Sequence, residues 1–156
     1  MKRIAVLLLT VTMVLLLLPA NAYAASDLQE TQVTEVQRFT DGSYLVITVQ
    51  TIETYASGTK TGTATCTYYS TSDEILWVAV LTGTFTYNGT TATCTASSCN
   101  VTVYKNNWYV ISKSASKNAN AATGTVTMGC KFLGVTIMQE TYDLSLSCDP
   151  NGNIGP

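Results

Sequence analysis

The chain has 156 residues, of which 46% are hydrophobic and only 12% charged, with a formal net charge of −2 and no histidine. A disordered chain would carry more charge and fewer aromatic and β-branched residues, and a nucleic-acid-binding protein would carry a basic surplus, so both classes are excluded. Without histidine, the chain supplies neither a His-dependent triad nor a His-containing zinc site. We therefore expect no cofactor, no metal and no nucleic-acid partner.

The first 24 residues have the three regions of a secretory signal peptide. Lys2 and Arg3 form a positive start, residues 4–18 are apolar, and Ala22-Tyr23-Ala24 offers the small residues that a signal peptidase reads. The apolar run is shorter than the roughly 20 residues that span a bilayer. We predict a chain that is secreted or loosely associated with the cell envelope, with no membrane anchor and a net charge of −4 over residues 25–156.

The remaining sequence is rich in β-branched residues, threonine above all, which favour the pleated surface of a sheet. Along residues 75–87, large apolar residues share one parity, and threonine takes the other parity in the second half, as in a strand with one solvent-facing side. No segment of comparable length has helical spacing. We predict a flexible lead-in over residues 25–32 and one β domain over residues 33–156.

Turn sequences divide this domain into about nine strands. The predicted hairpins are 33–39 with 44–53, 75–87 with 90–96, 101–105 with 108–112, and 124–131 with 135–148. In the third of these, Asn106-Asn107 forms the turn and Tyr104 lies opposite Tyr109. Because no helix lies between the strands, we predict an all-β fold, namely an antiparallel β-sandwich, immunoglobulin-like or similar, with a small β-barrel as the alternative.

All five cysteines lie in the part predicted to be exported, so disulfides are expected. Cys94 and Cys99 flank four residues that could form a short loop closed by a disulfide. Cys66, Cys130 and Cys148 all have inward parity, but a straight hairpin would put Cys148 far from Cys130. Cys66 and Cys148 are therefore the second predicted pair, which leaves Cys130 as a buried free thiol. A nucleophilic Cys130 is the alternative, but a single lysine is the only activating charge nearby and no histidine can act as its base.

Carboxylates are the only remaining acid–base candidates. Asp73 and Glu74 are adjacent in a predicted turn, and Glu140 and Asp143 are three residues apart on a strand, hence on opposite faces. Neither pair makes the two facing carboxylates of a glycosidase, so we predict no enzyme. Residues 149–153 resemble the start of a calcium loop, but their glycine comes too early for one, and we expect a simple turn.

Two aromatic pairs offer candidate binding residues. Tyr68 and Tyr69 are consecutive, as are Trp108 and Tyr109, so one member of each pair must face away from the core. Exposed tyrosines stack on sugar rings and anchor protein contacts. We predict Tyr69 and Tyr109 as the residues that bind an extracellular glycan or protein.

Several segments spread over the part predicted to be exported carry a further signal, namely Lys60-Thr61-Gly62, Tyr68-Tyr69-Ser70, Leu76-Trp77-Val78, residues 82–89, residues 112–117 and residues 148–152. With these segments the chain resembles a group of small secreted proteins of Gram-positive, gut-type bacteria. The resemblance implies export and a compact β domain, and it assigns no activity and no site residues.

These observations predict a secreted, disulfide-containing β-sandwich that serves as a non-catalytic extracellular binding module for a glycan or a protein surface. A structural or self-assembling component of the cell envelope is the first alternative. A carboxylate-dependent hydrolase is the second.

Overall fold

The structure is a computed structural model that describes residues 29–53 and 58–156. The predicted signal peptide and residues 25–28 of the predicted lead-in lie outside the described residues. Within them, every regular element is a strand. The strands are β1 (Gln29–Arg38), β2 (Tyr44–Glu53), β3 (Thr59–Tyr69), β4 (Ile75–Tyr87), β5 (Ala92–Val103), β6 (Trp108–Asn118), β7 (Ala121–Phe132), β8 (Val135–Cys148) and β9 (Ile154–Gly155).

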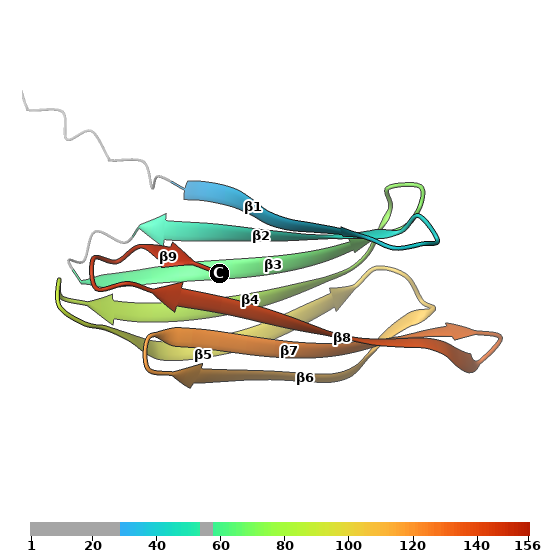
Figure 1. Ribbon diagram of the computed structural model, residues 1–156. Coiled ribbons are helices and arrows are strands. Elements are labelled where there is room, and N and C mark those ends of the chain that lie inside the picture. Colours follow the sequence, from blue (N-terminus) through green and yellow to red (C-terminus); the bar gives the residue numbers. More distant parts are fainter. Residues whose placement is uncertain (1–28, 54–57) are drawn as a thin grey trace, which may run out of the picture.

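The strands form two antiparallel sheets that pack face to face (Figure 1). One sheet holds β1 to β5 in chain order, and the other holds β6 to β9 in chain order. The predicted β-sandwich is confirmed, and the sheets do not close into a barrel. Each sheet is a meander, without the Greek-key crossover of immunoglobulin domains.

The predicted hairpin around Asn106-Asn107 is wrong, because β5 and β6 belong to different sheets. The loop between them is hydrogen-bonded to one sheet at its start and to the other at its end. The Tyr104 amide donates to the Leu76 carbonyl (2.9 Å), and the Lys131 amide donates to the Asn107 carbonyl (2.8 Å). This loop therefore carries the chain across the sandwich, and Tyr104 does not face Tyr109.

The number of strands agrees with the prediction, but the predicted and observed sets of strands differ in two places. Residues 90–96 and 101–105 do not form separate strands, since a single strand, β5, runs from Ala92 to Val103. The short strand β9 was not predicted. In addition, β1 begins at Gln29, where it pairs with Ile52 of β2, so residues 29–32 are strand rather than flexible lead-in.

Strict alternation on the central strands builds the core. On β4, Trp77, Ala79, Leu81 and Phe85 are fully buried, while the outward residues Val78, Val80, Thr82 and Thr84 are partly exposed. Burying large apolar side chains in this way stabilises the fold by about 1.5–3 kcal/mol each. The outward positions of the same strands hold many of the threonines, which accounts for the composition of the chain.

The core differs between the two ends of the sandwich. Near one end the Tyr68 ring stacks on Trp77 at 5.5 Å between centroids, with Trp108 and Tyr142 packed beside them. Towards the other end the sheets approach closely, since a Cβ on Gly83 would stand 3.0 Å from the Ala122 side chain. Bulky aromatics thus separate the sheets at the first end, and small residues bring them together at the other.

We call the first end the hairpin end, because the β1–β2, β3–β4 and β7–β8 turns and the β5–β6 loop all lie there (Figure 1). The β4–β5, β6–β7 and β8–β9 turns lie at the opposite end. Every candidate residue can be placed relative to these two ends and to the outer faces of the two sheets.

Candidate functional site

Tyr69 lies on the outer face of the five-stranded sheet, where its ring is part of a stack. The Tyr44 ring lies parallel to it at 4.8 Å between centroids, and the Arg38 guanidinium covers Tyr44 at 5.1 Å. The Tyr44 hydroxyl donates to the Asp73 carboxylate (2.9 Å), which fixes the stack in place. Sugar recognition needs an open ring face, and Tyr44 already occupies one face of Tyr69.

Tyr109 lies on the outer face of the other sheet, where neighbours cover it on both sides. Its ring atoms occupy the space in which a Cβ on Gly129 would stand, at distances of 2.5–2.8 Å. The Lys131 ammonium group lies over the ring, 4.4 Å from its centroid, and the hydroxyl bonds to Thr136 Oγ1 at 2.7 Å. The structure therefore separates Tyr69 and Tyr109 on opposite faces and engages both rings within the protein.

All five cysteines are buried thiols, with no disulfide among the described residues. Cys94 and Cys99 lie on the same extended strand, opposite Phe85 and Leu81 of β4. Five strand positions span about 16 Å, whereas the Cα atoms of a disulfide are less than about 7 Å apart. The structure does not bring this predicted pair together, because the expected loop is absent.

Cys66 and Cys148 are also far apart. Cys148 pairs with Ile154, and the Ile154 side chain lies against Gly62 of β3. Cys66 is four positions further along β3, which corresponds to about 13 Å. The second predicted pair is therefore not brought together either.

Cys130 lies at the base of the β7–β8 hairpin, opposite Trp108. Burial raises the pKa of its thiol, although the Asn107 amide, which donates to the sulfur at 3.4 Å, acts in the opposite direction. A raised pKa lowers the fraction of thiolate, which is the nucleophilic form. The position does not favour a reactive cysteine.

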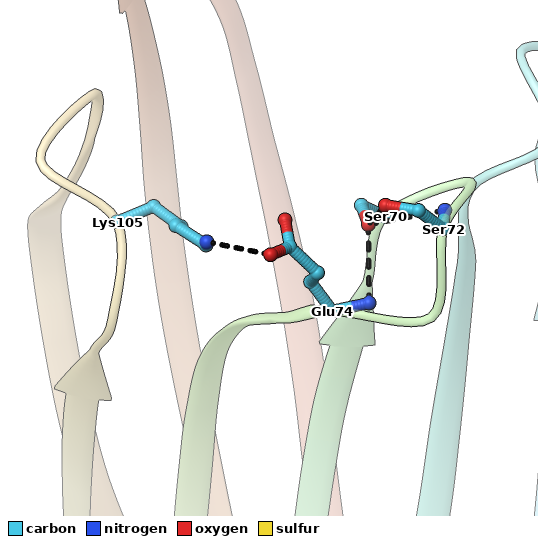
Figure 2. Close-up of polar contacts among 4 residues, drawn as sticks. All are labelled: Ser70, Ser72, Glu74 and Lys105. Carbon is cyan, nitrogen blue, oxygen red and sulfur yellow. Dashed lines mark hydrogen bonds and ion pairs between the residues drawn. The ribbon is translucent and has the colours of Figure 1, made fainter.

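Three of the four predicted acidic candidates, Asp73, Glu74 and Asp143, are held by individual partners. Glu74 pairs with Lys105 (3.2 Å) across the gap between the β3–β4 turn and the β5–β6 loop (Figure 2). Asp73 accepts the hydrogen bond from Tyr44, and Asp143 accepts one from Thr125 (2.7 Å). Nothing in this arrangement positively indicates catalysis.

Residues 149–153 are predicted to form a simple turn, and hydrogen bonds to the carboxylate of Asp149 hold this turn together. The Asp149 carboxylate accepts hydrogen bonds from the Asn151 amide, the Asn153 amide and the Asn153 side chain, at 2.7–2.9 Å. These donors lower the pKa of Asp149, the Asn153 side chain most of all. Among the residues that the structure describes, no group of three His, Cys, Asp or Glu side chains could hold a metal ion.

The most exposed apolar surface is a feature that the sequence analysis missed. The β7–β8 hairpin projects past the other turns at the hairpin end (Figure 1). We call residues Lys131–Met138 the projecting hairpin. Phe132, Leu133, Val135 and Ile137 within it are 63%, 88%, 66% and 64% exposed.

The turn of the projecting hairpin has unusual chemistry. Leu133 and Gly134 both have positive φ angles, +50° and +82°, as a two-residue hairpin turn requires. Asparagine, aspartate or glycine normally occupies the first of these positions, because they tolerate the left-handed conformation. The presence of a leucine instead of such a residue at position 133, with apolar residues on both sides of Gly134, is the signal in the sequence that marks this site.

A small cavity of about 200 Å³ lies at the base of the projecting hairpin. The aromatic side chains of Phe39, Tyr68 and Tyr142 line it, together with the carboxylates of Asp41 and Glu140. Tyr68 bonds to Ser43 (2.9 Å), which also bonds to Asp41 (2.6 Å), so the polar groups on one side of the cavity are satisfied within the protein.

Comparisons of the chain with protein-family models, with curated proteins and with solved structures found no match. In the part of the chain that the structure describes, no helix is long and apolar enough to cross a membrane. The candidate functional surface is therefore the surface of the sandwich itself, and above all the projecting hairpin.

Proposed function

We propose that this protein is a non-catalytic binding module that acts outside the cell and docks on another protein by inserting the projecting hairpin into an apolar groove of that partner. The observation that carries the proposal is the exposure of four large apolar side chains on one hairpin. Single exposed apolar residues are ordinary, whereas apolar residues gathered at one place mark interaction sites.

Leu133 supports this role because its placement lowers the stability of the free protein. A left-handed conformation costs a non-glycine residue about 1–2 kcal/mol, and the side chain is 88% exposed, so it gains almost nothing from burial. Stability alone would favour asparagine or glycine at this position. A leucine is explained when its side chain is buried in a complex.

A protein partner fits this surface better than a glycan. Glycan recognition combines open aromatic faces with polar side chains that bond to hydroxyl groups. At the tip, Leu133 and Val135 offer neither polar atoms nor a flat platform, the Phe132 ring carries no polar atoms of its own, and the Thr136 hydroxyl already bonds to Tyr109. Such side chains complement an apolar groove.

Charge also favours a protein over a lipid bilayer. Residues 25–156 carry six basic and ten acidic residues, and anionic bilayers attract clusters of basic residues. The lysines at this end are engaged within the protein, since Lys105 pairs with Glu74 (Figure 2) and Lys131 lies over Tyr109. The hairpin end therefore presents apolar side chains without a basic rim.

A stable complex buries about 800 Å² on each partner, more than a hairpin tip alone provides. The loop between β5 and β6 can supply the rest, because it lies at the same end and Tyr104 in it is 58% exposed. We assign the buried centre of the interface to Phe132 and Leu133 and its rim to the neighbouring turns, as in other interfaces where a few large side chains dominate the affinity.

The test measures binding of the purified chain to an array of purified extracellular proteins. We expect saturable binding to at least one of them, weakened about 30-fold in a chain carrying Phe132→Thr and Leu133→Asn, which corresponds to about 2 kcal/mol. Ile52→Thr is the matched control, because Ile52 is an exposed apolar residue at the opposite end, and it should leave the Kd unchanged.

Three results would overturn the proposal. The first is an array without saturable binding, and the second is binding that the hairpin substitutions do not weaken. The third is hairpin-dependent association with something else, namely glycans, phosphatidylcholine–phosphatidylglycerol vesicles, or a second copy of the chain as detected by light scattering. Self-association would favour the structural role instead.

A further inference from the structure

We propose that Cys94 and Cys148 form a disulfide that joins the two sheets at the opposite end of the sandwich. Cys94 lies near the start of β5 in the five-stranded sheet, and Cys148 is the last residue of β8 in the four-stranded sheet. This inference concerns the folded chain alone and does not depend on the partner of the projecting hairpin.

The backbone brings the two cysteines to the same turn. The Cys94 amide donates to the carbonyl of Ala119 (2.7 Å), and the Cys148 amide donates to the carbonyl of Asn120 (3.0 Å). The Asn120 side chain completes the contact by donating to the Cys148 carbonyl (2.8 Å). Two consecutive residues of the β6–β7 turn thus hold the backbone of one cysteine each.

The side chains of both cysteines point into the same part of the core. At Gly83 and Ala122 the two sheets approach closely, with a Cβ on Gly83 3.0 Å from the Ala122 side chain. Phe85 is the inward residue that follows Gly83 on β4, and it pairs with Cys94. On β8, Leu146 pairs with Ala122, and Cys148 is the inward residue that follows Leu146. Both sulfurs therefore lie just past this close approach, where β5 and β8 come into contact.

Electrostatics agrees with this placement. Burial is the main reason why the pKa of the Cys148 thiol is raised, and the charges of Asp149 and Cys94 raise it further. An influence of Cys94 on the pKa of the Cys148 thiol is consistent with the two side chains lying near each other in the core. Geometry also argues against Cys99 as the partner of Cys94, because Cys99 lies about 16 Å further along the same strand. It argues against Cys66 as the partner of Cys148, because Cys66 lies about 13 Å along β3 from Gly62, which contacts the Ile154 that pairs with Cys148.

The oxidation needs a disulfide donor, for which a low-molecular-weight disulfide such as oxidised glutathione suffices. One cysteine loses its proton to water, its thiolate attacks a sulfur of the donor, and the other half of the donor leaves as a thiolate. The second cysteine then attacks the mixed disulfide, closes the protein disulfide and releases the second half. The cysteines lose two electrons and two protons, and the donor is reduced to two thiols. Because both thiols are buried in the folded chain, the exchange accompanies folding.

Mass spectrometry without reduction tests the proposal. The reduced, unfolded chain is refolded with oxidised glutathione, remaining thiols are alkylated, and trypsin cleaves after Lys60, Lys105 and Lys131. We expect fragment 61–105 linked to fragment 132–156, with a mass lower than their sum by two hydrogen atoms. Fragmentation should place the alkyl groups of fragment 61–105 on Cys66 and Cys99.

Single substitutions assign the link within fragment 61–105. Cys94→Ala should abolish the linked fragment, whereas Cys99→Ala, an inward cysteine of the same strand, should retain it. A linked fragment that persists in Cys94→Ala, a link that involves fragment 118–131, or the absence of any link in the natural sequence would overturn the proposal. If Cys94→Ala does not fold, the fragmentation of the natural sequence decides the assignment alone.

Discussion

Tyr109 lies across Gly129 of the neighbouring strand, with its Cζ atom 2.5 Å from the position that a Cβ on residue 129 would take. The glycine is needed here because of this close approach, since the ring would have to leave its place to admit even a methyl group. The same contact explains why a tyrosine predicted to bind a ligand instead packs on its own sheet.

We expect Gly129→Ala to lower the free energy of unfolding by about 1–3 kcal/mol, the usual cost of overpacking. Denaturation with urea measures this change. In a Tyr109→Ala background the same substitution should cost far less, because the ring is no longer there. An equal cost in both backgrounds would show that Tyr109 is not the reason for the glycine.

We expect Tyr69→Ala to lower the stability of the protein by about 0.5–1.5 kcal/mol, through loss of its stacking on Tyr44, without changing the affinity for the partner. Thermal unfolding and a binding titration on the same sample measure the two quantities. Tyr69→Phe is the control and should keep both. Weaker binding by Tyr69→Ala at unchanged stability would instead show that Tyr69 belongs to the binding site.

Leu133→Asn should make the free protein more stable and the complex weaker. Asparagine tolerates the left-handed conformation at φ +50° and exposes no apolar surface, so we expect a gain of about 0.5–1 kcal/mol. Chemical denaturation measures the gain, and a titration with the partner measures the loss. A leucine that stabilises the isolated chain would contradict the argument that binding explains its presence.

Asp149 should contribute to stability in neutral solution and lose this contribution in acid. Its pKa is lowered in the folded state, so its contribution is complete above the unfolded value of about 3.9 and disappears as the pH falls through the lower folded value. Stability measured from pH 7 to pH 2 should therefore decline less steeply at the acidic end in Asp149→Asn. Identical slopes for the two proteins would contradict this role.

The proposed disulfide predicts a large effect of reductant on stability. Cys94 and Cys148 enclose a loop of roughly 50 residues, for which the chain-entropy model gives about 4 kcal/mol. Unfolding with and without dithiothreitol measures the difference in the oxidised protein, and Cys148→Ala should show none. Insensitivity of the oxidised protein to reductant would contradict a bridge between these cysteines.

The sequence predicted the features that depend on neighbouring residues. Alternation along Ile75–Tyr87 identified β4 and its buried face, and the predicted pairings of 75–87 with 90–96 and of 124–131 with 135–148 correspond to β4–β5 and β7–β8. The same reasoning failed at Asn106-Asn107, because a turn sequence does not reveal whether the chain returns along its own sheet or crosses to the other. Only the hydrogen bonds from Tyr104 to one sheet and from Lys131 to Asn107 decide this.

The site was harder to predict than the fold for a similar reason. Parity correctly indicated that Tyr69 and Tyr109 point outward, but whether an outward ring is open depends on neighbours such as Tyr44 and Lys131 on adjacent strands. For the cysteines, inward parity was informative and pairing was not, because the loop expected between Cys94 and Cys99 is continuous strand.

The order of the strands has a consequence for the way in which the chain folds. Because each sheet is a meander in chain order, each strand pairing within the described residues joins strands that follow each other in sequence, and the loops closed are short. Short loops lose little entropy on closure, so the hairpins can form one after another along the chain. The step that brings together segments far apart in the sequence is the packing of the two sheets against each other. The loop at Asn106-Asn107 is the connection between these two sheets.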